Sequence, residues 1–175
     1  IKFIQKDLNK MSFWSENIKI GNQEYSRFMS APLDGITDSP MRQLIRDYSK
    51  DILLFTEMRH LSCVANEKTG RSVKYNPIEQ PLCYQVSANR TRFLEEAVEK
   101  IVKNKFVMFN LNAGCPARAI VNSGTGSALM GNVPLLKELL ISFKNALPQT
   151  MPLTLKIRAG FKEKNAHDVS LMAEQ

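Results

Sequence analysis

Short apolar runs alternate with amphipathic segments along most of the chain, as they do where strands are followed by helices. The runs are rich in β-branched, aliphatic and aromatic residues, and their lengths are those of buried strands. Between them, apolar residues recur at spacings of three and four, which predicts helices with one buried face. We expect strands at residues 28–31, 52–56, 82–86, 106–109 and 153–157, and helices at 91–104 and 134–147, with an earlier helix that starts at 37–40 and runs through residue 48.

The first of these helices has a start signal of its own. Thr37-Asp-Ser-Pro40 offers a capping side chain followed by a proline at an early helical position. Apolar residues then follow at i, i+3, i+4 and i+7, and this spacing predicts that they form the buried face of the helix. These residues are Met41, Leu44, Ile45 and Tyr48.

The two ends of the chain differ from its middle. Residues 1–27 predict an extension that ends in a short hairpin, because strand-like alternation flanks Gly21-Asn22. Residues 28–175 predict one domain of repeating strand and helix units, which includes a short helix near 62–67. A last helix is expected to begin within residues 165–175, where the sequence stops.

Alternating strands and helices require parallel pairing through right-handed crossovers. The first strand is not followed by a GxGxxG motif, which disfavours a dinucleotide-binding Rossmann fold. Polar residues follow every predicted strand instead, as in a (β/α)8 barrel, whose active site lies at the carboxyl ends of its strands. The sequence therefore predicts an α/β fold of the TIM-barrel type, incomplete at about five βα units, because a whole barrel needs about 250 residues. The polar residues concerned are Asp34, Glu57, Gln85, Asn112, Cys115, Lys156 and Arg158.

The strand predicted at 106–109 leads into a turn that carries candidate chemistry. Its sequence is Asn110-Leu-Asn-Ala-Gly-Cys-Pro-Ala-Arg118, in which Gly114 and Pro116 force the chain to turn. A cysteine exposed at the end of a strand is placed to react, whereas a cysteine buried within a strand is usually a small apolar side chain. Cys115 is therefore the candidate reactive residue.

Composition and charge narrow the class of protein without changing the predicted fold. The chain is 43% hydrophobic and 23% charged, and no apolar run approaches the roughly 20 residues that span a membrane. Because the N-terminus lacks the apolar core of a secretory signal, we expect a cytoplasmic protein. Three scattered cysteines indicate neither a disulfide framework nor a zinc site. The formal net charge of +7 favours a polyanionic partner without identifying it.

Five short motifs occur in a fixed order along the chain. They are Ala31-Pro-Leu-Asp-Gly-Ile-Thr-Asp-Ser-Pro40, Thr56-Glu-Met58, Asn112-Ala-Gly-Cys-Pro116, Gly124-Thr-Gly-Ser-Ala-Leu129 and Lys156-Ile-Arg158. Together they resemble the tRNA-dihydrouridine synthases, from about Phe28 to Gln175 and as far as the fifth strand of their barrel. The resemblance implies a TIM barrel that binds FMN and, with NADPH as the reductant, reduces the C5–C6 double bond of uridines in tRNA.

The resemblance also implies roles for individual residues. Cys115 would give a proton to uracil C5 while the flavin delivers hydride to C6. A cysteine thiol of ordinary pKa, about 8.5, is mostly protonated at neutral pH and suits this role. The backbone after the first strand would lie along the flavin ring, and a cation after the fifth would stabilise negative charge on the reduced ring. The residues implied in flavin binding are Pro32, Leu33, Asp34, Gln85, Asn112 and Lys156.

Several of these residues have structural alternatives. Asn112 would lie under the uracil or the flavin. The alternative is that its side-chain amide forms hydrogen bonds with the backbone of the Gly114 turn. Arg118 would contact RNA phosphate, and Arg158 would do the same or pair with Glu57. The alternative for Cys115 is a packed turn cysteine, and for Lys156 a lysine that extends to solvent.

The chain departs from the family at several positions. Leu33 and Asn110 stand where many relatives have Met and Asp, and Ala119 stands where a lysine near the RNA is common. Strands six to eight have no counterpart, nor have the flavin-phosphate site and the C-terminal RNA-binding domain, so we expect weak or no flavin binding by this chain alone. The open edges of the first and fifth strands favour self-association. The motif Gly124-Thr-Gly126 is expected to allow a tight turn or a close backbone approach.

Two other functions remain compatible with these residues. One is a non-catalytic RNA-binding or assembly module that keeps the surface of this fold, and the basic excess fits it as well. The other is a different FMN-dependent barrel oxidoreductase that acts on a small pyrimidine. Measuring NADPH oxidation with tRNA and with free uracil separates this last function from a tRNA enzyme.

Overall fold

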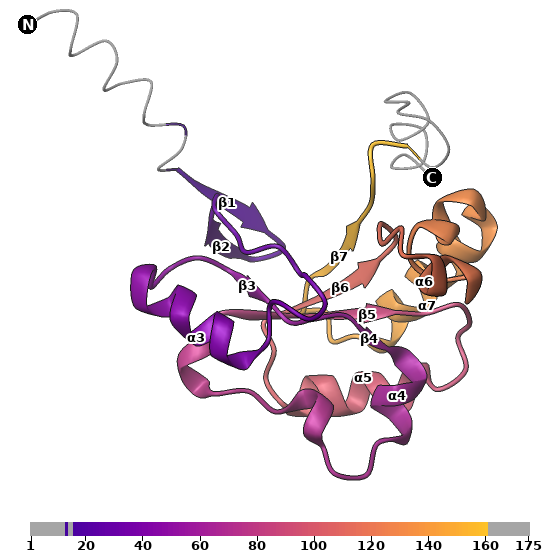
Figure 1. Ribbon diagram of the computed structural model, residues 1–175, viewed down its shortest axis with the longest axis horizontal. Helices are drawn as coiled ribbons and strands as arrows, with labels where there is room; N and C mark the ends of the chain where they lie inside the picture. Colours follow the sequence, from indigo (N-terminus) through magenta and orange to yellow (C-terminus); the bar gives the residue numbers. More distant parts are fainter. Residues whose placement is uncertain (1–12, 14–15, 161–175) are drawn as a thin grey trace, which may run out of the picture.

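A parallel sheet forms the centre of the fold, and helices cover one of its faces (Figure 1). The computed structural model describes residue 13 and residues 16–160. In the sheet, β5 lies between β3 and β6, β7 lies beside β6, and β4 pairs with β5 further along than β3 does. All of these pairings are parallel. The strands are β3 (Leu54–Phe55), β4 (Arg59–His60), β5 (Leu82–Ser87), β6 (Met108–Asn112) and β7 (Leu153–Lys156).

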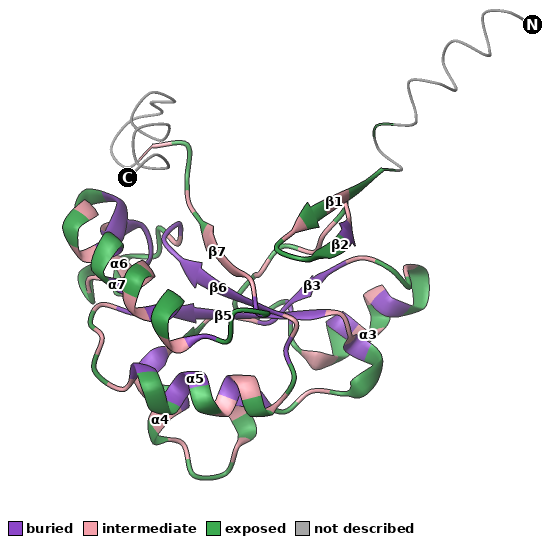
Figure 2. Cartoon of the chain, turned by 180° about the vertical axis from the view of Figure 1, so that it is seen from behind, coloured by how far each residue is buried: buried purple, intermediate pink, exposed green. Residues whose placement is uncertain are grey.

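Helices connect the strands, and the main core lies between them and the sheet (Figure 2). Tyr84 and Phe109 project from the sheet into this core, and Phe143 meets Phe109 from the helix side with ring centres 4.8 Å apart. The fold is therefore α/β, with the alternating strand and helix units of a partial TIM barrel, as predicted. The helices are α3 (Ser39–Tyr48), α4 (Leu61–Asn66), α5 (Leu94–Lys103), α6 (Arg118–Asn122) and α7 (Val133–Ala146), with 3-10 turns η1 (Arg71–Val73), η2 (Pro77–Glu79) and η3 (Gly126–Gly131).

A hairpin covers part of the other face of the sheet. Its strands, β1 (Asn17–Ile20) and β2 (Gln23–Ser26), pair antiparallel around Gly21-Asn22, as predicted. Figure 1 shows the hairpin on the side of the sheet opposite α4 and α5. Tyr25 of the hairpin is only 4% exposed because it packs in a second, smaller cluster on this inner face. The other buried members of that cluster are Leu53, Phe55, Cys83 and Met108.

The first predicted strand, at 28–31, is reduced to a single bridge. Met29 forms an isolated parallel bridge with Leu53, and the Ser30 amide donates to the Leu53 carbonyl at 3.0 Å. The pairing stops there because the amide of Phe55 donates to the Ser30 side-chain oxygen, at 3.0 Å, instead of to a backbone carbonyl. The short strand β4 was not predicted, since Arg59 and His60 lack apolar character. The helix expected within 165–175 lies outside the described residues.

Helix α3 begins where predicted, but the face that it buries differs from the predicted one. Asp38 caps it by accepting a hydrogen bond from the Met41 amide at 3.1 Å. Leu44 and Tyr48 are nevertheless 51% and 87% exposed, whereas Arg42 and Arg46 are buried. The predicted burial is therefore wrong for Met41, Leu44 and Tyr48, whereas Ile45 is partly buried and packs against the main core.

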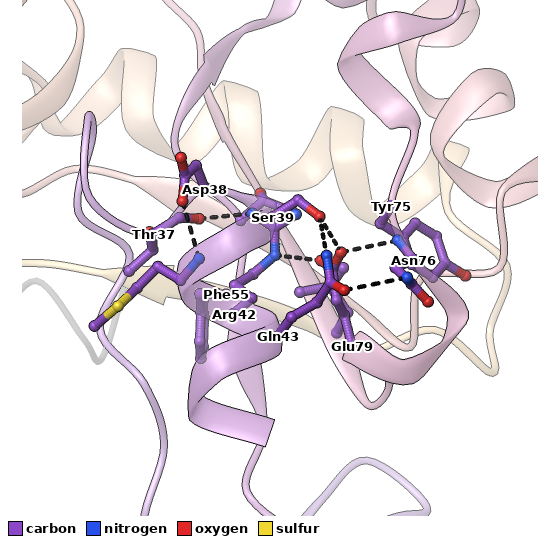
Figure 3. A network of polar contacts seen from close by, with 12 residues as sticks. Thr37, Asp38, Ser39, Arg42, Gln43, Phe55, Tyr75, Asn76 and Glu79 are labelled. Carbon is purple, nitrogen blue, oxygen red and sulfur yellow. Dashed lines mark hydrogen bonds and ion pairs between the residues drawn. The ribbon is translucent and has the colours of Figure 1, made fainter. Parts of the chain in front are cut away.

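Buried polar partners explain the orientation of α3. Glu79 of η2 is fully buried, and its carboxylate accepts a hydrogen bond from Arg42 Nε in an ion pair (Figure 3). The Ser39 hydroxyl donates to the same carboxylate, and Arg46 donates to the Glu79 backbone carbonyl at 3.0 Å. A buried charge must be paired and hydrogen-bonded, so the arginine face of α3 turns toward Glu79.

The two long later helices follow their sequence patterns. Helix α5 buries Leu94, Ala97, Val98 and Ile101, the residues predicted for its inner face. Helix α7 buries Leu136, Leu139 and Phe143, while Leu140 is only partly buried. Among the residues that the structure describes, no helix combines the length and the apolar character needed to cross a membrane.

Candidate functional site

The polar residues predicted at the strand ends meet at one edge of the sheet. Asn112 ends β6 and lies in register with Lys156, which ends β7. At the end of β3, the Glu57 carboxylate accepts a hydrogen bond from the Gly35 amide at 2.8 Å, which holds the loop after the first strand at the same edge. Because all the strands are parallel, this is the carboxyl edge, where a barrel assembles its active site.

A set of three side-chain amides and one hydroxyl, which we name the amide ladder, links three strands on the inner face. It consists of Gln85, Asn110, Asn112 and Thr154. Gln85 Nε2 donates to Asn110 Oδ1 at 2.7 Å, and Asn112 Nδ2 donates to Gln85 Oε1 at 2.9 Å. Asn110 Nδ2 in turn donates to the Thr154 hydroxyl oxygen at 2.8 Å. A carboxylate at residue 110 would be a buried charge, whereas the neutral amide of Asn110 uses both its donor and its acceptor.

The turn that carries Cys115 is held from both sides. Asn112 Oδ1 accepts hydrogen bonds from the amides of Gly114 and Cys115, at 3.1 and 2.9 Å. The Cys115 carbonyl accepts a hydrogen bond from the Ser127 amide at 2.9 Å. Cys115 itself is partly buried, so its thiol is held in a defined turn and stays within reach of solvent.

The glycine motif that follows folds closely over this turn. Gly126 has a φ of +60°, and a Cβ atom there would lie 2.7 Å from the Cys115 carbonyl oxygen and 2.6 Å from Ile120 Cγ2. Such contacts are too close for any side chain, so a residue without a Cβ atom is required. The predicted close backbone approach is confirmed at Gly126.

The structure gives Asn112 and Gln85 partners within the protein. The turn role left open for Asn112 is the one observed, because its oxygen holds the Cys115 turn and its nitrogen contacts Gln85. Gln85 is fully buried, and both atoms of its side-chain amide are used in the amide ladder. Flavin contact by either residue stays a prediction. Sequence reasoning missed Thr154 and Ser127, because they contact the site only across strands and loops.

The loop after the first strand and the cations of the site are open to solvent. Leu33 is 47% exposed, Asp34 is exposed and Pro32 is partly buried. Thr37 fixes this loop, since its hydroxyl oxygen accepts a hydrogen bond from the Leu33 amide at 3.0 Å. The remaining cations at the edge, Lys156, Arg118 and Arg158, are all exposed.

The predicted ion pair between Arg158 and Glu57 is wrong. Glu57 pairs with Arg59, at 3.3 Å, in addition to its hydrogen bond from the Gly35 amide. Arg59 lies two residues after Glu57 and begins β4, the strand that was not predicted. Through the Gly35 amide, Glu57 holds the loop after the first strand at this edge. The expected contact of Arg158 with RNA phosphate therefore stays a prediction.

Comparison with known proteins adds a decisive observation to this geometry. The family model described as dihydrouridine synthase (Dus) matches residues 29–175. The chain belongs to the dihydrouridine synthase family. Its members are FMN-dependent flavoprotein oxidoreductases that act on tRNA.

Three relatives show how far the similarity extends. The chain is 30% identical over 154 residues to a protein of Synechocystis sp. named "Probable tRNA-dihydrouridine synthase 1", covering 87% of the chain and 43% of that protein. It is 29% identical to tRNA-dihydrouridine synthase B of Pseudomonas aeruginosa, covering 86% of the chain and 46% of that protein. It is 28% identical to tRNA-dihydrouridine(20/20a) synthase of Escherichia coli (strain K12), covering 81% of the chain and 40% of that protein. The chain thus spans less than half the length of these curated relatives.

The hold of Asn112 on the turn can be tested directly. We expect Asn112→Ala to lower the free energy of unfolding by about 1 to 3 kcal/mol, because the buried Gly114 amide loses its acceptor. The same change should speed the reaction of Cys115 with a thiol reagent, measured in a Cys63→Ala background. Asn132→Ala is the control, because Asn132 accepts from the Leu135 amide at the start of α7, away from the turn. Equal thiol reactivity in the two variants would contradict the role of Asn112.

Proposed function

We propose that this chain is the catalytic part of a flavin-dependent enzyme that reduces the uracil C5–C6 bond of particular uridines in tRNA. NADPH would be the source of the electrons, and Cys115 the source of one proton. The observation that carries the proposal is the Cys115 turn, held by Asn112 and Ser127 at the carboxyl edge of the sheet. Membership in the dihydrouridine synthase family supports the same reaction.

The exposed groups at this edge have the chemistry that an isoalloxazine ring requires. Pro32 and Leu33 offer apolar surface to the flat ring, and the backbone of Asp34 lies in the same loop. Lys156 offers a cation beside Asn112, suited to the negative charge that a reduced flavin carries on its polar rim. When bound, the reduced flavin supplies the hydride. Pro32, Leu33, Asp34 and Lys156 are the residues that we propose hold it.

Cys115 has the properties of a general acid in this proposal. Its thiol would give a proton to C5, the carbon bonded to the C6 that receives hydride, so that the double bond gains two hydrogens in all. The partly buried position allows the resulting thiolate to regain a proton from solvent. The amide ladder would act indirectly, because Gln85 orients Asn112, and Asn112 holds the amide of Cys115.

Deleting the gene tests the proposed reaction. We expect dihydrouridine to disappear from at least one position of the tRNA pool, measured by mass spectrometry of purified tRNA. Ribosomal RNA from the same cells is the matched sample, because it separates a tRNA enzyme from one that acts on another RNA. Unchanged dihydrouridine in both RNA fractions would contradict the proposal, and restoration by the intact gene is the control.

A further inference from the structure

A small cavity opens beside β4 and β5 at the carboxyl edge of the sheet. Its volume is about 210 Å³. His60 ends β4 and pairs in register with Ser87, which ends β5, so the cavity lies where both strands finish. The first residues of α4 and the loop between β5 and α5 complete its walls. The lining residues are His60, Leu61, Ser62, Arg90, Arg92 and Phe93.

Two arginines give this cavity its charge. Arg90 and Arg92 are exposed, and among the described residues neither forms an ion pair with a carboxylate. Arg90 Nε donates to Asn89 Oδ1 at 3.1 Å, and the Arg92 guanidinium lies 4.7 Å from the centre of the Phe93 ring. These contacts leave most guanidinium N–H groups unused, because each guanidinium carries five. No carboxylate lines the cavity.

His60 contributes a neutral donor to the same cavity. Its Nδ1 accepts a hydrogen bond from the Ser62 amide at 3.3 Å and lies 2.7 Å from Ser62 Oγ. Because Nδ1 is an acceptor, the proton of the neutral ring lies on Nε2. Burial lowers the pKa of His60, and the charge of Arg90 lowers it further, so the ring is mostly neutral at neutral pH.

The cavity is joined to the segment that carries Cys115. Asn89 Nδ2 donates to the Ser123 carbonyl at 2.8 Å, and Ser123 caps the end of α6, the helix that follows the Cys115 turn. The oxygen of the same Asn89 amide accepts from Arg90. One side-chain amide therefore fixes the arginine loop relative to the candidate active site.

We infer that this cavity, formed around His60, Arg90 and Arg92, binds one phosphodiester group of the RNA substrate. The inference rests on the proposed function, which supplies the RNA. Walls with cationic and neutral donors and no carboxylate select an anion that presents several acceptor oxygens, and phosphate is such an anion. A phosphate contact positions RNA without reading its sequence, so this one would anchor the backbone near the uridine that reaches Cys115.

Removing both arginine charges tests the site through RNA binding. We expect Arg90→Gln combined with Arg92→Gln to weaken tRNA binding about tenfold at low salt. The slope of log Kd against log salt concentration should fall by about 0.7 to 0.9, the contribution of one phosphate. Fluorescence anisotropy over a salt series measures both quantities. Arg71→Gln is the control, because Arg71 is an exposed arginine outside the cavity lining, and it should leave the slope unchanged. An unchanged slope in the double variant would overturn the inference.

The NMR signal of His60 separates the possible sources of phosphate. The chain has two histidines, so a His60→Gln variant identifies the signal. A short single-stranded RNA should raise the pKa of His60, because a phosphate beside the ring favours its charged form. Inorganic phosphate should do the same at higher concentration, and NADPH, which carries phosphate groups of its own, should act only at higher concentration than the RNA does. A response to NADPH without a response to RNA would overturn the assignment to RNA.

Failure of this inference is distinguishable from failure of the proposed function. If dihydrouridine survives deletion of the gene while RNA still shifts the His60 signal, the cavity binds RNA phosphate and only the reaction is wrong. If dihydrouridine disappears but the double arginine variant keeps the affinity and salt slope of the wild type, the reaction stands and the phosphate site is wrong.

Discussion

Replacing Cys115 with alanine is expected to slow dihydrouridine formation by at least about 100-fold, since a positioned general acid contributes about 10²- to 10⁴-fold. The backbone hydrogen bonds of the turn involve the amide and the carbonyl of residue 115, so alanine keeps them. The variant should therefore fold and bind flavin as the wild type does. The rate is measured with reduced enzyme and unmodified tRNA, in the protein that carries this chain.

The other exposed thiol provides the control for this experiment. Cys63 lies on α4 and is more exposed than Cys115. Cys63→Ala should leave the rate within about twofold of the wild type, because it removes no group from the proposed site. If Cys115→Ala kept a rate within threefold of the wild type while retaining flavin absorbance, Cys115 would not be the proton donor.

Glu79→Gln is expected to lower the free energy of unfolding by about 3 to 5 kcal/mol, because it leaves the buried charge of Arg42 without a partner. Glu79 is fully buried, and Figure 3 shows Arg42, Ser39 and Asn76 arranged around its carboxylate. Such a loss is a large part of the stability of a typical domain, about 5 to 15 kcal/mol. Urea unfolding followed by circular dichroism measures it.

The same substitution at an exposed pair gives the matched control. Glu57→Gln removes the charge that pairs with Arg59, whose side chain is 47% exposed against 16% for Glu57, while an amide oxygen at residue 57 can still accept from the Gly35 amide, so the free energy of unfolding should change by less than about 1 kcal/mol. Adding Arg42→Met to Glu79→Gln should recover part of the loss, because it removes the unpaired charge. Similar losses from Glu79→Gln and Glu57→Gln would contradict a dominant role for the buried pair.

Periodicity predicted the elements whose burial depends on apolar side chains. The inner faces of α5 and most of α7, the hairpin and strand β5 all agree with the pattern, because each buries its apolar residues against the sheet. Helix α3 disagrees for a specific reason. Its partner across the interface is the carboxylate of Glu79, which lies 37 residues beyond Arg42, and spacing within one helix carries no information on such a partner.

The candidate site was predictable in its location and less so in its contacts. The order of strands and polar residues placed Asn112, Cys115 and Lys156 at one edge, since parallel strands end together. The bonds from Gln85 to Asn110 and Asn112 depend on which strands are neighbours and on their register. A linear pattern does not specify register to the residue, so the internal use of Gln85 emerged only from the structure.

The hairpin that covers the inner face has a consequence for the order of folding. Tyr25 is synthesised early, yet it packs against Phe55, Cys83 and Met108, which belong to strands made one after another. At its turn, Gly21 lies against Pro152, just before β7. Contacts between residues so distant in sequence form late and slowly. During translation the hairpin can therefore complete its packing only after most of the chain has been synthesised. Until then its apolar side is exposed, as a surface that chaperones can bind.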